Sequence, residues 1–169
     1  MNTSVKLIGL IVAVTFLVAC QPSKNKLKEQ IALSEKETSV GFDTNKLNNL
    51  LYLYNQYIND YPQDTTVGEY LFKAGIVSMT LRRGEESLHY FTTLIDRFPQ
   101  SPSLAEAYYY KAFVLEDVIY DINAAKDAYN DFIALFPNHK LASDAKLSLK
   151  YLGMTPDEIV NSFEQEGYE

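Results

Sequence analysis

The residue types that most often carry enzymatic chemistry are sparse in this sequence. It has two histidines, His89 and His139, and a single cysteine, Cys20. It has no Gly-rich phosphate loop, no His-Glu-x-x-His sequence and no cysteine pair that could bind a metal. Acidic pairs such as Glu85-Glu86 and Glu116-Asp117 fall where solvated helix ends are expected. We therefore expect both histidines to be surface or packing residues, and the protein to have no catalytic residues, metal or cofactor and not to be an enzyme.

Two lysines beside aromatic residues are the strongest candidates for a binding site. Tyr70-Leu71-Phe72-Lys73-Ala74 is followed 38 residues later by Tyr108-Tyr109-Tyr110-Lys111-Ala112. If the segments repeat, the lysines Lys73 and Lys111 hold equivalent positions. Together with Tyr70 and Tyr108 they could bind a carboxylate or an acidic peptide. The alternative is that the lysines are exposed solubilising residues and the tyrosines belong to the core.

The first twenty residues have the pattern of an export signal. One basic residue, Lys6, precedes an apolar run over residues 7–18, and Leu17-Val18-Ala19-Cys20 follows. The run is shorter than the roughly 20 residues of a membrane-spanning helix and suits the core of a signal peptide. The Leu-x-Ala-Cys ending resembles the lipobox of bacterial lipoproteins. That resemblance implies a signal peptide over residues 1–19 and a lipid (palmitate) anchor at Cys20, unless the segment is an uncleaved anchor or a plain signal cut elsewhere.

Residues 20–43 are expected to form a lipidated tether. Lys24, Lys26 and Lys28 could lie near anionic head groups, although a solvated linker fits equally well. Residues 26–37 could form a weak helix, but nothing in this part demands packed structure. Gln21 lacks the aspartate that retains many lipoproteins at the inner membrane, so the resemblance implies an outer-membrane anchor facing the periplasm.

The rest of the chain is acidic and long enough for one domain with a sizeable core. The sequence has 15 basic and 22 acidic residues, a net charge of −7. Without Lys6 the balance is 14 against 22, or −8. A nucleic-acid partner is not expected, because phosphate binding needs a basic surface. Thirteen tyrosines and nine phenylalanines, with no tryptophan, fit aromatic helix packing and peptide-binding surfaces.

A segment that ends in an aromatic residue and a proline occurs three times. The copies are residues 54–62, 91–99 and 129–137, and their prolines are 37 and 38 residues apart. Each copy starts with an aromatic residue and has a large apolar residue and isoleucine at its fourth and fifth places. A fixed period of this length is typical of stacked repeat proteins.

Apolar residues recur at helical spacing between these prolines. Leu47, Leu50, Leu51 and Tyr54 begin one such stripe over residues 45–61. This spacing along the chain predicts seven helices and no strands, so the expected fold class is all-α. The last helix, residues 156–165, follows a predicted capping box at Thr155-Pro156-Asp157-Glu158.

The alternation of helices resembles the tetratricopeptide repeat (TPR). The small, aromatic and closing positions of that family are matched by two triplets, Ser87, Phe91 and Pro99, then Ala125, Tyr129 and Pro137. The period exceeds the family's usual length of about 34 residues. The match therefore resembles divergent envelope lipoproteins, such as the BamD-like outer-membrane assembly factors and the YbgF-like partners of the Tol-Pal system.

This resemblance covers about residues 45–152 and implies a fold and a function. Residues 44–169 should form antiparallel helix pairs stacked as a short right-handed solenoid, with the first helix of each pair lining a concave groove. Helices 45–61 and 156–165 would cap its ends. The implied function is a non-enzymatic protein–protein interaction scaffold in an envelope complex, for outer-membrane assembly or cell division. The alternative is a peptide-, peptidoglycan- or glycan-binding module that uses a tyrosine-rich groove. The sequence identifies neither the partner nor the oligomeric state.

Overall fold

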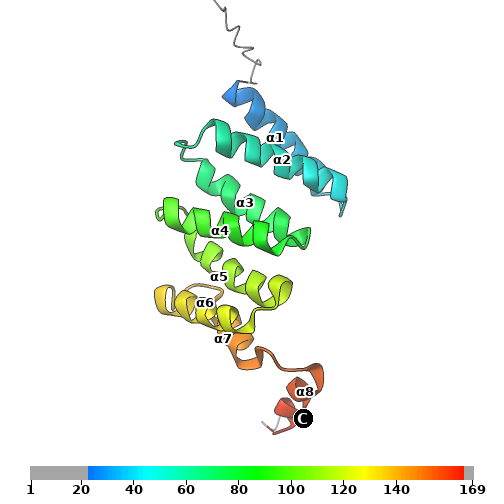
Figure 1. The fold of residues 1–169 in the computed structure, drawn as a ribbon, viewed down its shortest axis with the longest axis vertical. Coiled ribbons are helices and arrows are strands. Elements are labelled where there is room, and N and C mark those ends of the chain that lie inside the picture. Colours follow the sequence, from blue (N-terminus) through cyan, green and yellow to red (C-terminus); the bar gives the residue numbers. More distant parts are fainter. Residues whose placement is uncertain (1–22, 166–169) are drawn as a thin grey trace, which may run out of the picture.

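The computed structural model describes residues 23–165, and this part of the chain is entirely helical where it is regular. Consecutive helices pack against each other in pairs and stack along one axis (Figure 1). The predicted all-α, TPR-like solenoid is confirmed. The elements are α1 (Lys24–Thr38), α2 (Thr44–Asp60), α3 (Val67–Thr80), α4 (Gly84–Arg97), α5 (Leu104–Val114), the π-helix η1 (Leu115–Ile119), α6 (Ile122–Leu135), α7 (Ala142–Tyr151) and α8 (Pro156–Gln165).

The three aromatic-proline segments end their helices with the same backbone geometry. The aromatic before each proline has φ of −129°, −129° or −130° and ψ of 52°, 57° or 55°. Two residues after each proline, a backbone N–H donates to that aromatic residue's carbonyl oxygen, at 2.9, 2.9 and 3.1 Å. The side chain of the same residue accepts from the N–H two positions further on. These three residues are Asp64, Ser101 and His139, and they show that the sequence repeat is also a structural repeat.

Helix α1 occupies much of the segment that the sequence suggested was a tether. Leu27, Ile31 and Ser34 are buried where α1 packs on α2. The prediction of a tether over residues 20–43 is therefore wrong for Lys24–Thr38, and α2 is not the end of the stack. Three buried positions spaced four and three residues apart are enough to dock a helix that is otherwise polar. Cys20 and the expected signal peptide lie outside the described residues.

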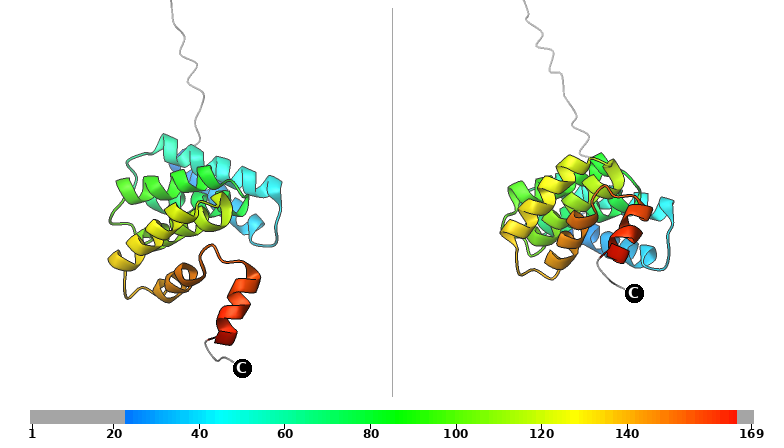
Figure 2. Two further views of the ribbon diagram at one scale, coloured as in Figure 1. Left: turned by 60° about the horizontal axis from the view of Figure 1, so that its bottom comes forward. Right: turned by 90° about the horizontal axis from the view of Figure 1, so that it is seen from below.

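The opposite end of the stack is not closed as predicted. The expected capping box forms, since Glu158 accepts a hydrogen bond from the Thr155 N–H at 2.7 Å and the Glu158 N–H donates to Thr155 Oγ1 at 3.3 Å. However, Val160 and Phe163 on α8 remain 56% and 41% exposed, and α8 points away from the other helices (Figure 2). The prediction that residues 156–165 cap the core is thus wrong. The Phe163 ring, 5.5 Å from that of Tyr151, links α8 to α7.

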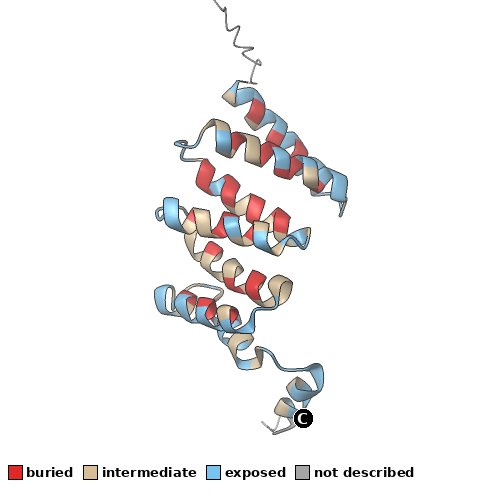
Figure 3. Cartoon of the chain, in the orientation of Figure 1, coloured by how far each residue is buried: buried red, intermediate tan, exposed pale blue. Residues whose placement is uncertain are grey.

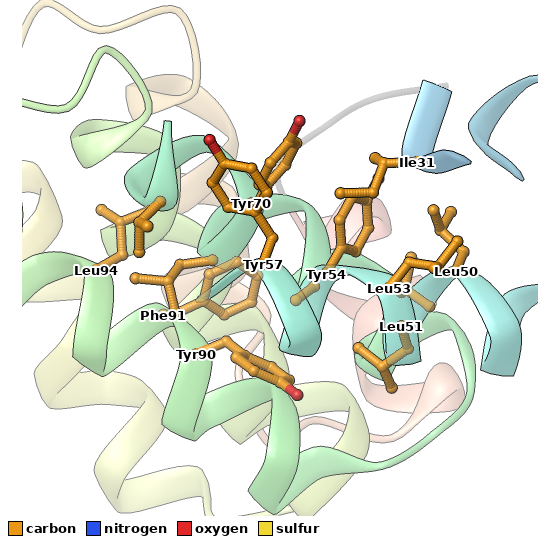
Figure 4. Close-up of a cluster of buried hydrophobic side chains, with 14 of the residues drawn as sticks. Ile31, Leu50, Leu51, Leu53, Tyr54, Tyr57, Tyr70, Tyr90, Phe91 and Leu94 are labelled. Carbon is orange, nitrogen blue, oxygen red and sulfur yellow. The ribbon is translucent and has the colours of Figure 1, made fainter. Parts of the chain in front are cut away.

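Buried residues run along the stack from α1 to α6 (Figure 3). Their side chains form two core clusters. The larger one spans α1 to α5 and is built around aromatic rings, including Tyr54, Tyr57 and Phe91 (Figure 4). Close packing needs a glycine at position 75, because a Cβ there would lie 2.6 Å from the Phe91 ring. The smaller cluster is centred on Phe132 between α5, α6 and α7.

The π-helix η1 absorbs the one residue by which the two repeat intervals differ. At the turn after α3, the Arg83 N–H donates to the Ser78 carbonyl oxygen at 2.9 Å, five residues back. At the matching turn after η1, the Asp121 N–H donates to the Leu115 carbonyl oxygen at 2.9 Å, six residues back. A π-helix is the usual way to fit one extra residue into a helical turn. Equivalent positions are therefore 37 residues apart before η1 and 38 residues apart after it.

Candidate functional site

The two candidate lysines do not hold equivalent positions in the structure. Helices α3 and α5 begin 37 residues apart, at Val67 and Leu104, and the extra residue of η1 comes only later. The counterpart of Lys73 is therefore Tyr110, and the counterpart of Lys111 is the position of Ala74, which is buried. One residue along a helix turns a side chain by about 100°. The 38-residue match between the two tyrosine-lysine segments predicted the wrong register.

Lys73 is already held by two carboxylates. Its Nζ lies 2.9 Å from Glu35 Oε1 on α1 and 2.6 Å from Glu69 Oε1 on its own helix. Partial burial lowers the pKa of Lys73, but hydrogen bonds to Glu69 and Glu35 outweigh it, so its pKa is raised overall. One cation between two anions leaves this cluster with a net charge of −1. A carboxylate ligand would therefore have to displace one of these partners.

The tyrosines of the candidate site belong mainly to the core. Tyr70 is 7% exposed, and its ring centroid lies 5.4 Å from that of Tyr54 and 4.7 Å from that of Tyr57. Burial, followed by the charge of Glu69, raises the pKa of Tyr70 to about 12. Tyr108 is half-buried, with its ring 5.5 Å from that of Phe136.

This burial does not provide the tyrosine face that a glycan-binding groove would need. The tyrosines that are largely exposed in the described part of the chain are Tyr52 on α2 and Tyr120 after η1, which come from separate repeats.

Lys111 is half-buried, and its side chain forms no ion pair or hydrogen bond within residues 23–165.

The hollow beside Lys73 is a groove between α1 and α3, with α2 as its floor. Its volume is about 500 Å³. Glu35, Lys73 and Thr80 supply polar groups along its walls, and Tyr54 in the groove donates a hydrogen bond to Glu35 at 2.7 Å. Sequence reasoning missed the groove because it assigned α1 to a tether, although the spacing of Leu27 and Ile31 was a usable signal. The apolar lining consists of Leu47, Leu50, Phe72, Ile76 and Val77.

The remaining candidate residues show no catalytic arrangement in residues 23–165. His139 lies in the loop between α6 and α7 with Nε2 3.5 Å from Glu106 Oε1, and its ring packs on Phe132. His89 packs beside Tyr90 with a centroid distance of 6.0 Å. No cluster of three or more His, Cys, Asp or Glu side chains in the described range could hold a metal ion. The described helices also include none that is long and apolar enough to cross a membrane.

Comparison with known families agrees with the helical-repeat architecture. Residues 106–139, from the first turn of α5 to the loop after α6, match the family model of the tetratricopeptide repeat. The matched range contains Ala125, Tyr129 and Pro137, the residues that the sequence resemblance assigns to the small, aromatic and closing positions of the repeat. No curated protein matches the chain. The fold and this match together support a TPR-like repeat protein, a class that generally mediates protein–protein interactions.

Proposed function

We propose that the protein is a non-enzymatic interaction scaffold that binds protein partners through the groove between α1 and α3. The observation that carries this proposal is the composition of the groove on a TPR-like stack. Five apolar side chains line a groove whose edge carries the Glu35–Lys73–Glu69 cluster. This arrangement suits an amphipathic segment that buries apolar residues and places a polar residue at the charged edge.

Cross-linking from the groove would test this function. A photo-reactive amino acid at Thr80, which is exposed and lines the groove, is compared with one at Tyr52, which lies outside it. We expect a discrete protein adduct at position 80 and none at position 52. The same adducts at both positions, or an adduct at position 52 alone, would place the interaction elsewhere and contradict the groove assignment.

We further propose that the scaffold is lipid-anchored at Cys20 and acts in an envelope complex at the outer membrane, facing the periplasm, for membrane assembly or cell division. The support is the sequence of residues 1–20, with its short apolar run and Leu-x-Ala-Cys ending. Metabolic labelling with radioactive palmitate tests this proposal. Cys20→Ala should abolish the label and release the protein from the membrane fraction. Undiminished membrane association and labelling of that variant would rule out the anchor.

A further inference from the structure

The loops after α2, α4 and α6 share one backbone geometry, but side chains bridge them differently. At the first loop, Lys24 of α1 pairs with Asp64, and Lys28 Nζ donates to Thr66 Oγ1 at 3.1 Å. At the third loop, Glu106 of α5 faces two basic side chains. Its Oε1 lies 3.5 Å from His139 Nε2 and 3.2 Å from Lys140 Nζ. At both loops a basic side chain reaches across to an oxygen acceptor and ties the loop to the first helix of the preceding pair.

At the middle loop, after α4, helix α3 carries an acidic residue, but the loop has no basic residue to pair with it. Glu69 of α3 is the counterpart of Glu106, 37 residues earlier, and Ser101 and Pro102 stand where the third loop has His139 and Lys140. Neither a serine nor a proline side chain can form an ion pair with Glu69. Gly68 places no side chain in this space, where a Cβ would be in ordinary contact with Ser101 Oγ at 3.5 Å. A pocket of about 710 Å³ remains at this loop.

The walls of this pocket suit a long basic side chain. Phe98 and Pro102 give it an apolar surface, and Glu69, which is 54% exposed at its side chain, supplies the carboxylate. Lys73 contacts Glu69 but is shared with Glu35, so the cluster keeps a net negative charge.

A positive side chain also lines the pocket. The Arg97 Nη2 donates to the Pro62 carbonyl oxygen at 3.2 Å, and the guanidinium lies 5.4 Å from the Phe98 ring. It is thus bound to the neighbouring loop and forms no ion pair with Glu69.

We propose that this pocket, at the middle loop, binds a lysine or arginine side chain of a protein partner. The charged end pairs with Glu69, and the aliphatic stem packs along Phe98 and Pro102. The two flanking loops show the same kind of contact made by the chain's own residues. The net charge of −7 also favours a basic partner segment. This inference rests on the proposed interaction function and specifies the chemistry of one contact.

Binding of N-acetyl-argininamide and N-acetyl-lysinamide, followed by amide NMR shifts of the purified protein, tests the pocket. Saturable shifts are expected at Gly68, Ser101 and Ser103, and the uncharged N-acetyl-norleucinamide should produce much smaller ones. Glu69→Gln should weaken binding at least about fivefold, by loss of a charge-assisted hydrogen bond. Ser101→His, which supplies the side chain of the third loop, should fill the pocket and abolish binding.

The control is Asp131→Asn, which removes the same charge from an exposed position on α6. Its affinity should stay within about twofold of the unmodified protein, since surface charges act weakly at a distance in salt. No saturable shift, equal binding of the norleucine compound, or equal weakening by Asp131→Asn would overturn the pocket assignment. Cross-linking from Thr80 is independent of this pocket, so a positive result there would leave the scaffold function standing.

Discussion

At the scale of single residues, buried tyrosines join the two helices of a pair. Tyr54 on α2 donates to Glu35 on α1 at 2.7 Å, and Tyr129 on α6 donates to Glu116 in η1 at 2.6 Å. Burial, followed by the hydrogen bond to the carboxylate, raises the pKa of both tyrosines. Their rings fill the core, and their hydroxyls place a carboxylate at the edge of the pair.

The raised pKa of Tyr70 predicts a loss of stability in alkali. Its pKa rises from 10.0 to about 12 in the folded protein. The contribution of protonated Tyr70 to the stability of the fold is complete below pH 10. It is lost as the pH rises toward about 12, because the tyrosine releases its proton at lower pH in the unfolded chain than in the folded one. Urea unfolding across this range should show a smaller loss for Tyr70→Phe than for the unmodified protein. Tyr52→Phe, at an exposed position, should behave like the unmodified protein. If the free energy of unfolding fell equally steeply with pH in both variants, Tyr70 would not be a source of the alkaline loss.

Phe132 should be among the most costly core positions to truncate. It is fully buried, and its ring centroid lies 5.6, 5.8 and 5.7 Å from those of Tyr109, Phe136 and His139. Phe132→Ala should lower the free energy of unfolding by about 3–5 kcal/mol, measured by urea denaturation. Leu135→Ala, at an exposed position on the same helix, should change it by no more than about 0.5 kcal/mol. Similar losses for the two variants would show that Phe132 is not a central core residue.

At the scale of helices, prediction from sequence succeeded where the apolar stripe is broad. Helices α2 to α8 were all expected, because residues such as Leu47, Leu50 and Leu51 recur at helical spacing. Helix α1 was not expected as part of the fold, because its buried face is narrow and lysines surround it. Its docking depends on the shape of α2, which a local sequence pattern does not show.

The candidate site was less predictable than the fold, for a related reason. Lys73 lines a groove, but its partner Glu35 lies 38 residues away on α1, which the sequence did not predict as part of the fold. The equivalence with Lys111 failed because the extra residue sits in η1, after both lysines, and local sequence similarity favoured the wrong offset. Short motifs therefore defined the repeat but not its register, which depends on backbone hydrogen bonds.

The packing of η1 against α4 makes Gly84 sensitive to substitution. A Cβ at this position would lie 2.6 Å from Ile119 Cγ1. Gly84→Ala should cost about 1–3 kcal/mol by overpacking, as measured by urea denaturation. The cost should shrink in an Ile119→Ala background, since the two sites are in contact. Gly41→Ala, with no atom within 4 Å of the new Cβ, should change stability by less than about 1 kcal/mol. A neutral Gly84→Ala would contradict this packing.

At the scale of the whole molecule, the two ends of the stack differ. Helix α1 completes the first pair and forms one wall of the groove, with Leu27 and Ile31 fully or almost fully buried. Helix α8 leaves Val160 and Phe163 exposed and covers little of the stack. Each pair in a solenoid is stabilised mainly by its neighbours, so loss of a packed end should weaken the array more than loss of a projecting one.

Equilibrium unfolding of two truncated chains tests most directly whether α1 is an integral part of the fold. Starting the domain at Asp43 removes α1 and should lower the free energy of unfolding by roughly 3–6 kcal/mol, from the burial of Leu27 and Ile31 alone. Ending the domain at Thr155 removes α8 and should have a far smaller effect. If the chain without α1 unfolds at the same urea concentration as the intact protein, α1 is a tether after all, and the groove between α1 and α3 is not a stable feature of the molecule.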